Sequence, residues 1–134
     1  MSEVEQLGAK MGVDDVWFKT AQVYNYEHGN ELLPENEKFS RYRKNSTGRY
    51  VLKNELLNHC WKQWHSCVIT WDGKVVPCCF DKDAIHQLGD LKKEPFQSIW
   101  KGEKYQQFRG TLLKSRKEID ICSNCSEGTV VWGS

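Results

Sequence analysis

Residues 67–78 read CVITWDGKVVPC, two apolar β-rich runs joined by Asp72-Gly73. Asp-Gly between apolar runs is a strong signal for a two-residue hairpin turn, in which both turn residues adopt a positive φ. In that register Cys67 lies directly opposite Cys78, and opposed residues have Cβ atoms about 4.5–5.5 Å apart. The stretch therefore predicts a β-hairpin that carries two thiols on one face and Cys79 on the other.

Two helices are expected after the hairpin. Pro95 fits a first helical position, and Gly102 fits a C-terminal cap. Apolar side chains at 3–4 spacing define one face of each helix: Phe96, Ile99 and Trp100 on the first, then Tyr105, Phe108 and Leu112 on the second. The cations Lys114, Arg116 and Lys117 fall near the end of the second helix, where they complement its dipole, and we expect them on a solvated face.

Length and charge limit the class of protein. The chain has 134 residues, which predicts one domain. It has 19 Lys+Arg against 18 Asp+Glu, which is not the strongly basic balance of a nucleic-acid-binding domain. No run approaches the about 18 apolar residues of a membrane helix, and the acidic first residues lack the apolar core of a secretion signal. We expect a cytoplasmic protein without a nucleic-acid or membrane partner.

Six cysteines are the unusual feature of the composition, and none precedes residue 60: Cys60, Cys67, Cys78, Cys79, Cys122 and Cys125. Three disulfides would need an oxidising compartment, and cytosolic thiols stay reduced. Buried unreactive thiols account for one or two of the six, and a redox C-x-x-C should open a helix after a strand. Here the C-x-x-C lies near the C-terminus, at Cys122 and Cys125. Thiols from three chain segments instead suit a four-cysteine site for zinc or an iron–sulfur cluster.

The spacing of these motifs resembles that of a known family. Cys60, Gly73 and Cys78 meet a C-x(9–15)-G-x4-C element. Downstream follow, in order, Cys79-Phe80-Asp81, Leu88-Gly89-Asp90-Leu91, Ile99-Trp100, Arg109 and Cys122-Ser123-Asn124-Cys125. Together these residues resemble the SPASM/Twitch domain, the C-terminal auxiliary iron–sulfur cluster domain of radical SAM enzymes.

The resemblance implies an α+β fold class, with a small SPASM/Twitch-like domain at about residues 58–128 in which a β-hairpin is followed by helices. Residues 1–57 resemble the end of a radical SAM barrel and its connecting segment. A remnant helix with an apolar stripe and a remnant strand over residues 13–19 of that partial α/β barrel are therefore expected before the domain; the stripe is Val4, Leu7 and Met11. Residues 25–49 are polar and are interpreted as a long connection, and residues 129–134 as a C-terminal tail.

The resemblance also assigns the cysteines. By position it implies that one auxiliary [4Fe–4S] cluster is bound by Cys60, Cys78, Cys122 and Cys125. Cys67 is the reserve ligand, because some family members use a cysteine between the first ligand and the hairpin ligand, and because the expected register places it opposite Cys78. Cys79 is expected to be a packed neighbour that binds no metal.

Other side chains near these cysteines have ordinary explanations. His59 and His65 are able to ligate zinc or a Rieske-type centre, but we expect hydrogen-bonded or exposed histidines. Trp61, Trp64 and Trp71 would line a peptide site, shield a cluster from solvent, or build a small core. We expect a core role for most of them, and we expect Trp71, beside the turn, to be exposed.

Radical SAM catalysis needs a C-x3-C-x2-C loop, which the cysteine spacings do not provide. We therefore expect a chain that is not catalytic alone and that is part of a radical SAM enzyme, an oxidoreductase whose missing barrel, in cis or in trans, binds SAM. In the family the auxiliary cluster is proposed to support substrate placement or electron transfer, here for a peptide- or small-molecule-modifying enzyme. The alternative is a structural zinc-binding interaction module that uses the same four cysteines, and zinc is also a possible substitute in a cluster site.

Overall fold

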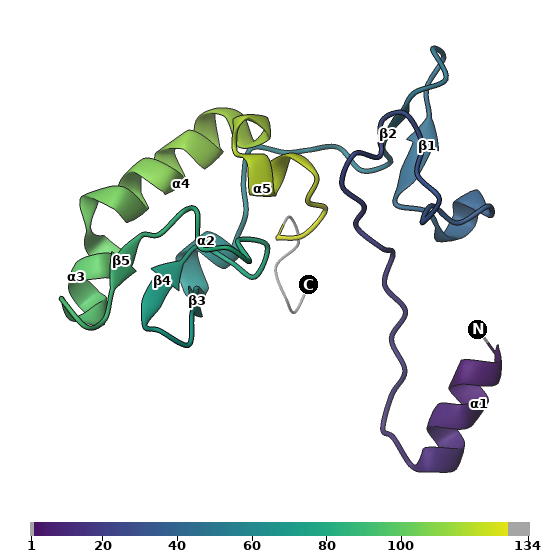
Figure 1. Ribbon diagram of the computed structural model, residues 1–134, viewed down its shortest axis with the longest axis horizontal. Coiled ribbons are helices and arrows are strands. Elements are labelled where there is room, and N and C mark those ends of the chain that lie inside the picture. The colour runs from purple at the N-terminus through teal and green to yellow at the C-terminus, as the bar shows by residue number, and fades with distance from the viewer. Residues whose placement is uncertain (1, 129–134) are drawn as a thin grey trace. The chain divides into compact units, whose positions relative to one another are not determined.

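The computed structural model describes residues 2–128. The chain divides into two compact units, Met1–Val51 and Leu52–Ser134. Both units contain helix and strand, which confirms the α+β fold class (Figure 1). The expected C-terminal tail, residues 129–134, lies outside the described residues.

The first unit begins with α1 (Ser2–Met11), the helix expected there. Its apolar stripe is largely exposed, with Leu7 at 54% and Met11 at 72%. Residues 13–19 adopt no regular structure, so the expected remnant strand is not formed in the described part of the chain. A strand is held by backbone hydrogen bonds to a neighbouring strand, and the described sheets contain no strand paired with this segment.

The segment expected to be only a connection contains regular structure. A short 3₁₀ helix, η1 (Glu37–Phe39), precedes two strands, β1 (Tyr42–Lys44) and β2 (Tyr50–Leu52), which pair as a two-stranded sheet. The Tyr42 side chain is 1% exposed, and its ring stacks on Tyr26 with centroids 4.2 Å apart. The polar composition of this segment gave no sign of the hairpin, because the hairpin packs through a single buried aromatic side chain, Tyr42, rather than through an apolar run.

The second unit contains a three-stranded antiparallel sheet. A one-turn helix, α2 (Lys62–His65), leads into β3 (Val68–Ile69), which pairs with β4 (Lys74–Val76). The third strand, β5 (Gly89–Asp90), pairs with the other edge of β4 and was not expected from the sequence. This places β4 in the middle of the sheet, where its buried valines join the core.

The hairpin expected at the centre of the sequence is present, but its register differs from the expected one by one residue. Ile69 pairs with Val75, so Cys67 does not oppose Cys78 as predicted. The reason is the turn: the loop has three residues and only its last, Gly73, has a positive φ, at 85°. A type I turn followed by one left-handed residue is the usual three-residue hairpin loop. The Asp-Gly signal predicted the hairpin correctly and the loop length wrongly.

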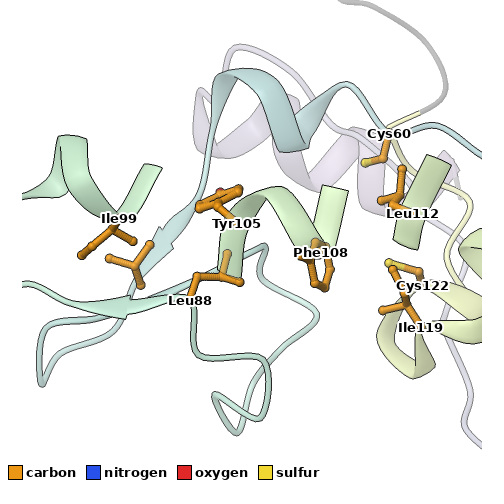
Figure 2. Close-up of a cluster of buried hydrophobic side chains, with 9 residues drawn as sticks. Cys60, Leu88, Ile99, Tyr105, Phe108, Leu112, Ile119 and Cys122 are labelled. Carbon is orange, nitrogen blue, oxygen red and sulfur yellow. The ribbon is translucent and has the colours of Figure 1, made fainter. Parts of the chain in front are cut away.

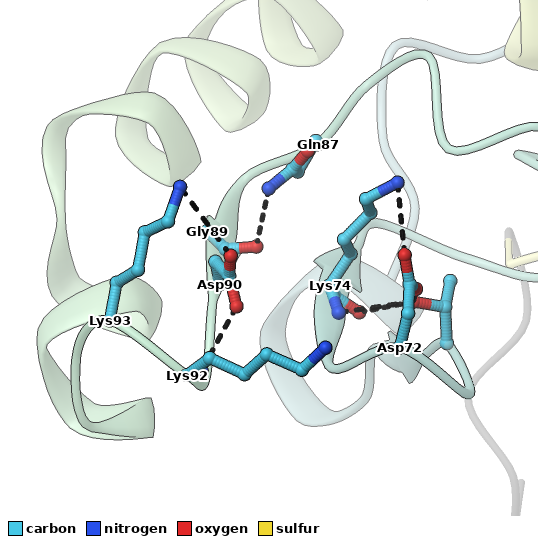
Figure 3. A network of polar contacts seen from close by, with 8 residues as sticks. Asp72, Lys74, Gln87, Gly89, Asp90, Lys92 and Lys93 are labelled. Carbon is cyan, nitrogen blue, oxygen red and sulfur yellow. Dashed lines mark hydrogen bonds and ion pairs between the residues drawn. The ribbon is translucent and has the colours of Figure 1, made fainter.

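Side chains stabilise this longer loop (Figure 3). The Thr70 hydroxyl donates to Oδ1 of Asp72 at 2.5 Å, and the backbone N–H of Lys74 donates back to the Thr70 hydroxyl at 3.0 Å. The Lys74 ammonium lies 3.1 Å from the Asp72 carboxylate. At the end of β5, Asp90 accepts a hydrogen bond from the backbone N–H of Lys92 at 2.9 Å. The loop is therefore held by its own polar residues.

Four helical segments follow the sheet: α3 (Phe96–Lys101), α4 (Glu103–Ser115), η2 (Arg116–Glu118) and α5 (Asp120–Ser123). Gly102 is the C-cap of α3, as expected, while Pro95 is its N-cap rather than its first helical residue. Among the described helices of the chain, none is long and apolar enough to cross a membrane.

The core of the second unit runs along α4 (Figure 2). Tyr105 and Leu112 are fully buried and Phe108 is 8% exposed, which confirms the helix face predicted from their spacing. At one end of the row lies Ile99 of α3, and at the other end lie Cys60 and Cys122. The apolar core therefore extends directly to two of the cysteines.

Candidate metal centre

Four cysteines from three chain segments lie around one end of this core. Cys60 precedes α2, Cys78 follows β4, and Cys122 and Cys125 lie in and directly after α5. Their environments are closed: Cys60 is 7% exposed, Cys122 6% and Cys125 5%, while Cys78 is partly buried. The sheet supplies one of these thiols and the ends of the helical segments supply the others.

Burial and mutual proximity govern the acidity of these thiols. Desolvation is the largest cause at both positions for which a shift is clear, and it raises the pKa of Cys78 to about 11 and that of Cys122 to about 12. Negative charge on Cys79 raises the pKa of Cys78 further, and negative charge on Cys78 raises that of Cys122. Charges on Cys125 and Cys60 add smaller increases to both. Cys78 and Cys122 therefore lie within electrostatic reach of the other candidate ligands, and at neutral pH these two thiols need a cation before they release their protons.

The donor set fits an iron–sulfur cluster in chemistry and burial. Thiolates are soft ligands that select zinc or iron–sulfur clusters, and a coordinated thiol is deprotonated outright. Within residues 2–128, no three His, Cys, Asp or Glu side chains are placed closely enough to hold one metal ion. Ligands from distant segments are brought together when metal binding and folding are coupled.

Backbone amides also point at two of the sulfurs. The N–H of Glu127 donates to Sγ of Cys125 at 3.3 Å, and the N–H of Phe80 forms a hydrogen bond with Cys78 that lowers its thiol pKa against the larger effect of burial. Hydrogen bonds to ligand sulfurs are one of the factors that set the reduction potential of a cluster.

Gly128 packs directly against Cys60. Its φ is +77°, and a Cβ atom at this position would collide with Sγ of Cys60. Its carbonyl accepts a hydrogen bond from the backbone N–H of Trp61 at 2.8 Å. Only glycine allows the chain to pass this close to the sulfur in this conformation.

Of the three cations expected on a solvated face near the end of the second helix, Lys114 and Lys117 are exposed, but Arg116 is buried, which corrects the expectation at that residue. The side chain is 1% exposed, and its guanidinium donates to the carbonyl of His59 at 3.0 Å and to the carbonyls of Cys125 and Glu127 at 3.3 and 2.7 Å. These bonds connect the segment before Cys60 to the segment after the C-x-x-C. Its positive charge also lowers the pKa of Cys122 against the larger effects of burial and of Cys78.

The segment before Cys60 is held at a second point. The Asn58 side chain donates to the carbonyl of Lys114 at 2.9 Å and accepts from the backbone N–H of Arg116 at 3.0 Å. On the other side of Cys60, Lys62 of α2 forms an ion pair at 3.5 Å with Glu127, which follows the C-x-x-C. Sequence reasoning missed these contacts because none of them follows a spacing rule: each joins residues more than 50 positions apart.

The remaining two cysteines lie in different surroundings. Cys67 packs against the core, and burial raises its pKa. Its charge is among those that raise the pKa of Tyr105, after the larger effect of burial, but it is not among those acting on Cys78 or Cys122. Cys79 is exposed, so the expectation of a packed neighbour is wrong. Its strand ends at Val76, before the alternation of faces reaches it.

An apolar pocket of about 490 Å³ opens beside Cys60. It is lined by His59, Cys60, Trp61, Trp64 and Leu113. Trp61 is 49% and Trp64 42% exposed, so the expectation that they belong to the core is wrong. Trp71 is 99% exposed, as predicted. The two indoles border the pocket because the short helix α2 directs only Gln63 fully into the interior.

The histidines show one contact that the sequence did not suggest. His65 is exposed, as expected. Nε2 of His86 lies 2.6 Å from Oδ1 of Asp120, which links the loop after β4 to the first turn of α5. The buried Asp81 carboxylate accepts the backbone N–H groups of Ile85 and His86 at 2.8 and 2.9 Å, which shapes that loop. The helix that carries Cys122 is thereby fixed from the side of the sheet.

Comparison with known proteins adds an independent result. A family model described as SPASM, an iron–sulfur cluster-binding domain, matches residues 60–126. Among solved structures, the crystal structure of selenomethionine BtrN in an open conformation is similar, with 21% sequence identity and a TM-score of 0.49. The match covers 97% of this chain and 53% of BtrN, so the chain spans about half the length of that protein. No curated protein matches the sequence.

Proposed function

Because the chain belongs to the SPASM family of iron–sulfur cluster-binding domains, we propose that it is the auxiliary-cluster part of a radical SAM enzyme. One [4Fe–4S] cluster is bound by Cys60, Cys78, Cys122 and Cys125. The observation that carries this assignment is the burial of Cys60, Cys122 and Cys125 and the partial burial of Cys78, with Cys78 and Cys122 in electrostatic reach of the others. A reducing cytoplasm suits such thiols.

The cluster, when bound, supplies one-electron transfer at a potential set by its ligands and surroundings. The protein residues hold the sulfurs, exclude water from them and donate N–H groups to them. Since burial raises the pKa of Cys78 to about 11 and of Cys122 to about 12, these thiols carry protons at neutral pH in the metal-free chain. Cluster insertion therefore releases protons and becomes more favourable as pH rises.

The domain acts together with a radical SAM barrel that binds SAM and that is supplied in cis or in trans. Residues 58–128 form the cluster domain, and residues 1–57 belong to the end of the barrel and its connection. In this arrangement the auxiliary cluster helps to place a peptide or small-molecule substrate, or exchanges an electron with it. The chain contains no C-x3-C-x2-C loop of its own, which supports this division of labour.

Anaerobic reconstitution of the full chain with iron and sulfide tests the assignment. We expect a brown protein with absorption near about 400 nm from four-thiolate iron–sulfur ligation. Cys78→Ser is expected to lose the iron, and Cys79→Ser is the matched control, because it changes the adjacent, exposed thiol and should retain the iron. A colourless protein that holds one zinc ion after this treatment would instead establish the structural zinc module.

The reserve ligand is decided in the same series. The observed register does not place Cys67 opposite Cys78, so Cys67→Ser should keep the iron content of the wild type. Iron loss in Cys67→Ser together with full iron retention in Cys60→Ser would show that Cys67 is the ligand and that Cys60 is not.

A further inference from the structure

Arg116 is a buried cation whose charge is not balanced by a carboxylate. Its side chain is 1% exposed, and three backbone carbonyls accept its guanidinium N–H groups, those of His59, Cys125 and Glu127. The ion pairs formed within residues 2–128 do not include it. The carbonyls accept from the two terminal nitrogens of the guanidinium, while its buried Nε has no hydrogen-bond partner among the described residues. Burying a charge without a counter-charge is costly.

The candidate ligand thiols near this guanidinium become negatively charged when they bind a metal. The Cys125 carbonyl is one of its acceptors, and the Cys122 side chain lies within reach of its field. Protonated thiols would offer it no anion. Four thiolates outweigh the positive charge of an oxidised [4Fe–4S] core, so the ligated cluster is an anion, and it becomes more negative when it takes up one electron.

We propose that Arg116 is the built-in counter-cation of the cluster, which favours cluster retention and raises the cluster's reduction potential. The inference rests on the proposed function, because it needs a cluster on the four cysteines. The cation stabilises the reduced form more than the oxidised form, since the reduced form carries one more negative charge. Its position is fixed by the hydrogen bonds that connect the Cys60 segment to the C-x-x-C segment. One side chain therefore supplies both the positive charge and the connection between the two segments.

Two substitutions separate the effect of the positive charge from the effect of the hydrogen bonds to the three carbonyls. Arg116→Lys keeps the positive charge but has no planar fork for three carbonyls, and Arg116→Gln removes the charge and keeps a polar side chain. The matched control is Arg109→Gln. Arg109 is 7% exposed and donates to the carbonyls of Gln63 and Trp100 at 2.8 and 3.0 Å, so it is also a buried arginine bound by backbone carbonyls. Its charge acts on the Tyr105 hydroxyl rather than on the cysteines.

The experiment measures iron retention and the midpoint potential of the anaerobically reconstituted full chain, with dithionite as the one-electron reductant and redox mediators. We expect Arg116→Gln to shift the reduction equilibrium about tenfold towards the oxidised form, which is 59 mV more negative for a one-electron couple. We also expect a chelator to remove its iron faster than from the wild type. Arg116→Lys should keep the wild-type potential, and so should Arg109→Gln.

Every result decides the proposal. Loss of the cluster in Arg116→Gln with retention and a wild-type potential in Arg116→Lys supports it. Equal potentials in wild type, Arg116→Gln and Arg116→Lys overturn it, and so does loss of the cluster in both variants at position 116, because the side chain then acts only through its carbonyl bonds. A wild-type chain that takes up no iron overturns the proposed function itself, which is a different outcome from a wild type that holds a cluster insensitive to Arg116.

Discussion

Replacing Leu112 by Ala tests the link between the core and the cysteines. Leu112 is fully buried on α4 beside Cys60 and Cys122, whereas its chain neighbour Leu113 is 54% exposed (Figure 2). Truncation of a fully buried Leu leaves a cavity and costs about 2–5 kcal/mol, of which we take about 3 kcal/mol here. For a domain of this size, 1 kcal/mol corresponds to about 4–8 °C in Tm, so Leu112→Ala should lower Tm by about 12–24 °C.

Leu113→Ala is the matched control, because it makes the same chemical change one residue along the same helix. Its effect should stay within about 0.5 kcal/mol, the usual range for a surface substitution. Both variants are measured after anaerobic reconstitution, by thermal unfolding followed with circular dichroism and by iron retention. Equal Tm losses in the two variants, or a Leu112→Ala variant that melts like the wild type, would refute the placement of the core against the cysteines.

Three further predictions concern the turn, the sulfur contact and acid stability. Gly73→Val should lower Tm, since a β-branched residue resists the φ of 85° found there, and an unchanged melting curve would contradict the three-residue loop. Gly128→Ala should reduce iron retention, because its Cβ collides with Sγ of Cys60 and a positive φ costs an L-residue about 1–2 kcal/mol; retention equal to that of the wild type would show that this contact is not part of the site. The hydrogen bond from His86 lowers the pKa of Asp120, with a smaller contribution from a backbone N–H. A lowered pKa means that the stabilisation is present above the unfolded value of the carboxyl and disappears as pH falls through the folded value. Acid unfolding of Asp120→Asn should therefore lack this step, and identical acid titrations of wild type and variant would disprove it.

The elements that the sequence predicted correctly are those with strong local rules. The helix face of Tyr105, Phe108 and Leu112 follows from their 3–4 spacing, and all three are buried. The hairpin follows from Asp72-Gly73 between apolar runs, and it is present. The family resemblance followed from the order and spacing of cysteines, glycine and aromatic residues, and the family match over residues 60–126 confirms it.

The features that the sequence did not predict depend on contacts between distant residues. A two-residue loop needs a positive φ at both Asp72 and Gly73, but only Gly73 has one. The hydrogen bond from the Thr70 hydroxyl to Asp72 favours the three-residue loop. The pairing of β5 with β4 joins segments that no turn signal connects. The one-residue difference in register means that Cys67 does not lie opposite Cys78, so the register no longer supports Cys67 as the reserve ligand.

Arg116 shows the same limit at the candidate site. Its sequence context, between Ser115 and Lys117 at the end of a helix, is typical of a solvated cation. Its burial follows instead from carbonyl groups at His59 and Glu127, 57 and 11 residues away. Charge runs therefore give no information about which member points inward, and only the folded arrangement does.

Acid-labile sulfide in the anaerobically reconstituted full chain tests the central claim most directly, because a four-thiolate zinc site contains none. We predict about four sulfides per chain with an equal amount of iron, the content of one [4Fe–4S] cluster. We predict almost no sulfide in Cys122→Ser under the same treatment. A wild-type chain without sulfide that holds one zinc ion, or a Cys122→Ser variant with the full sulfide content, would contradict the account.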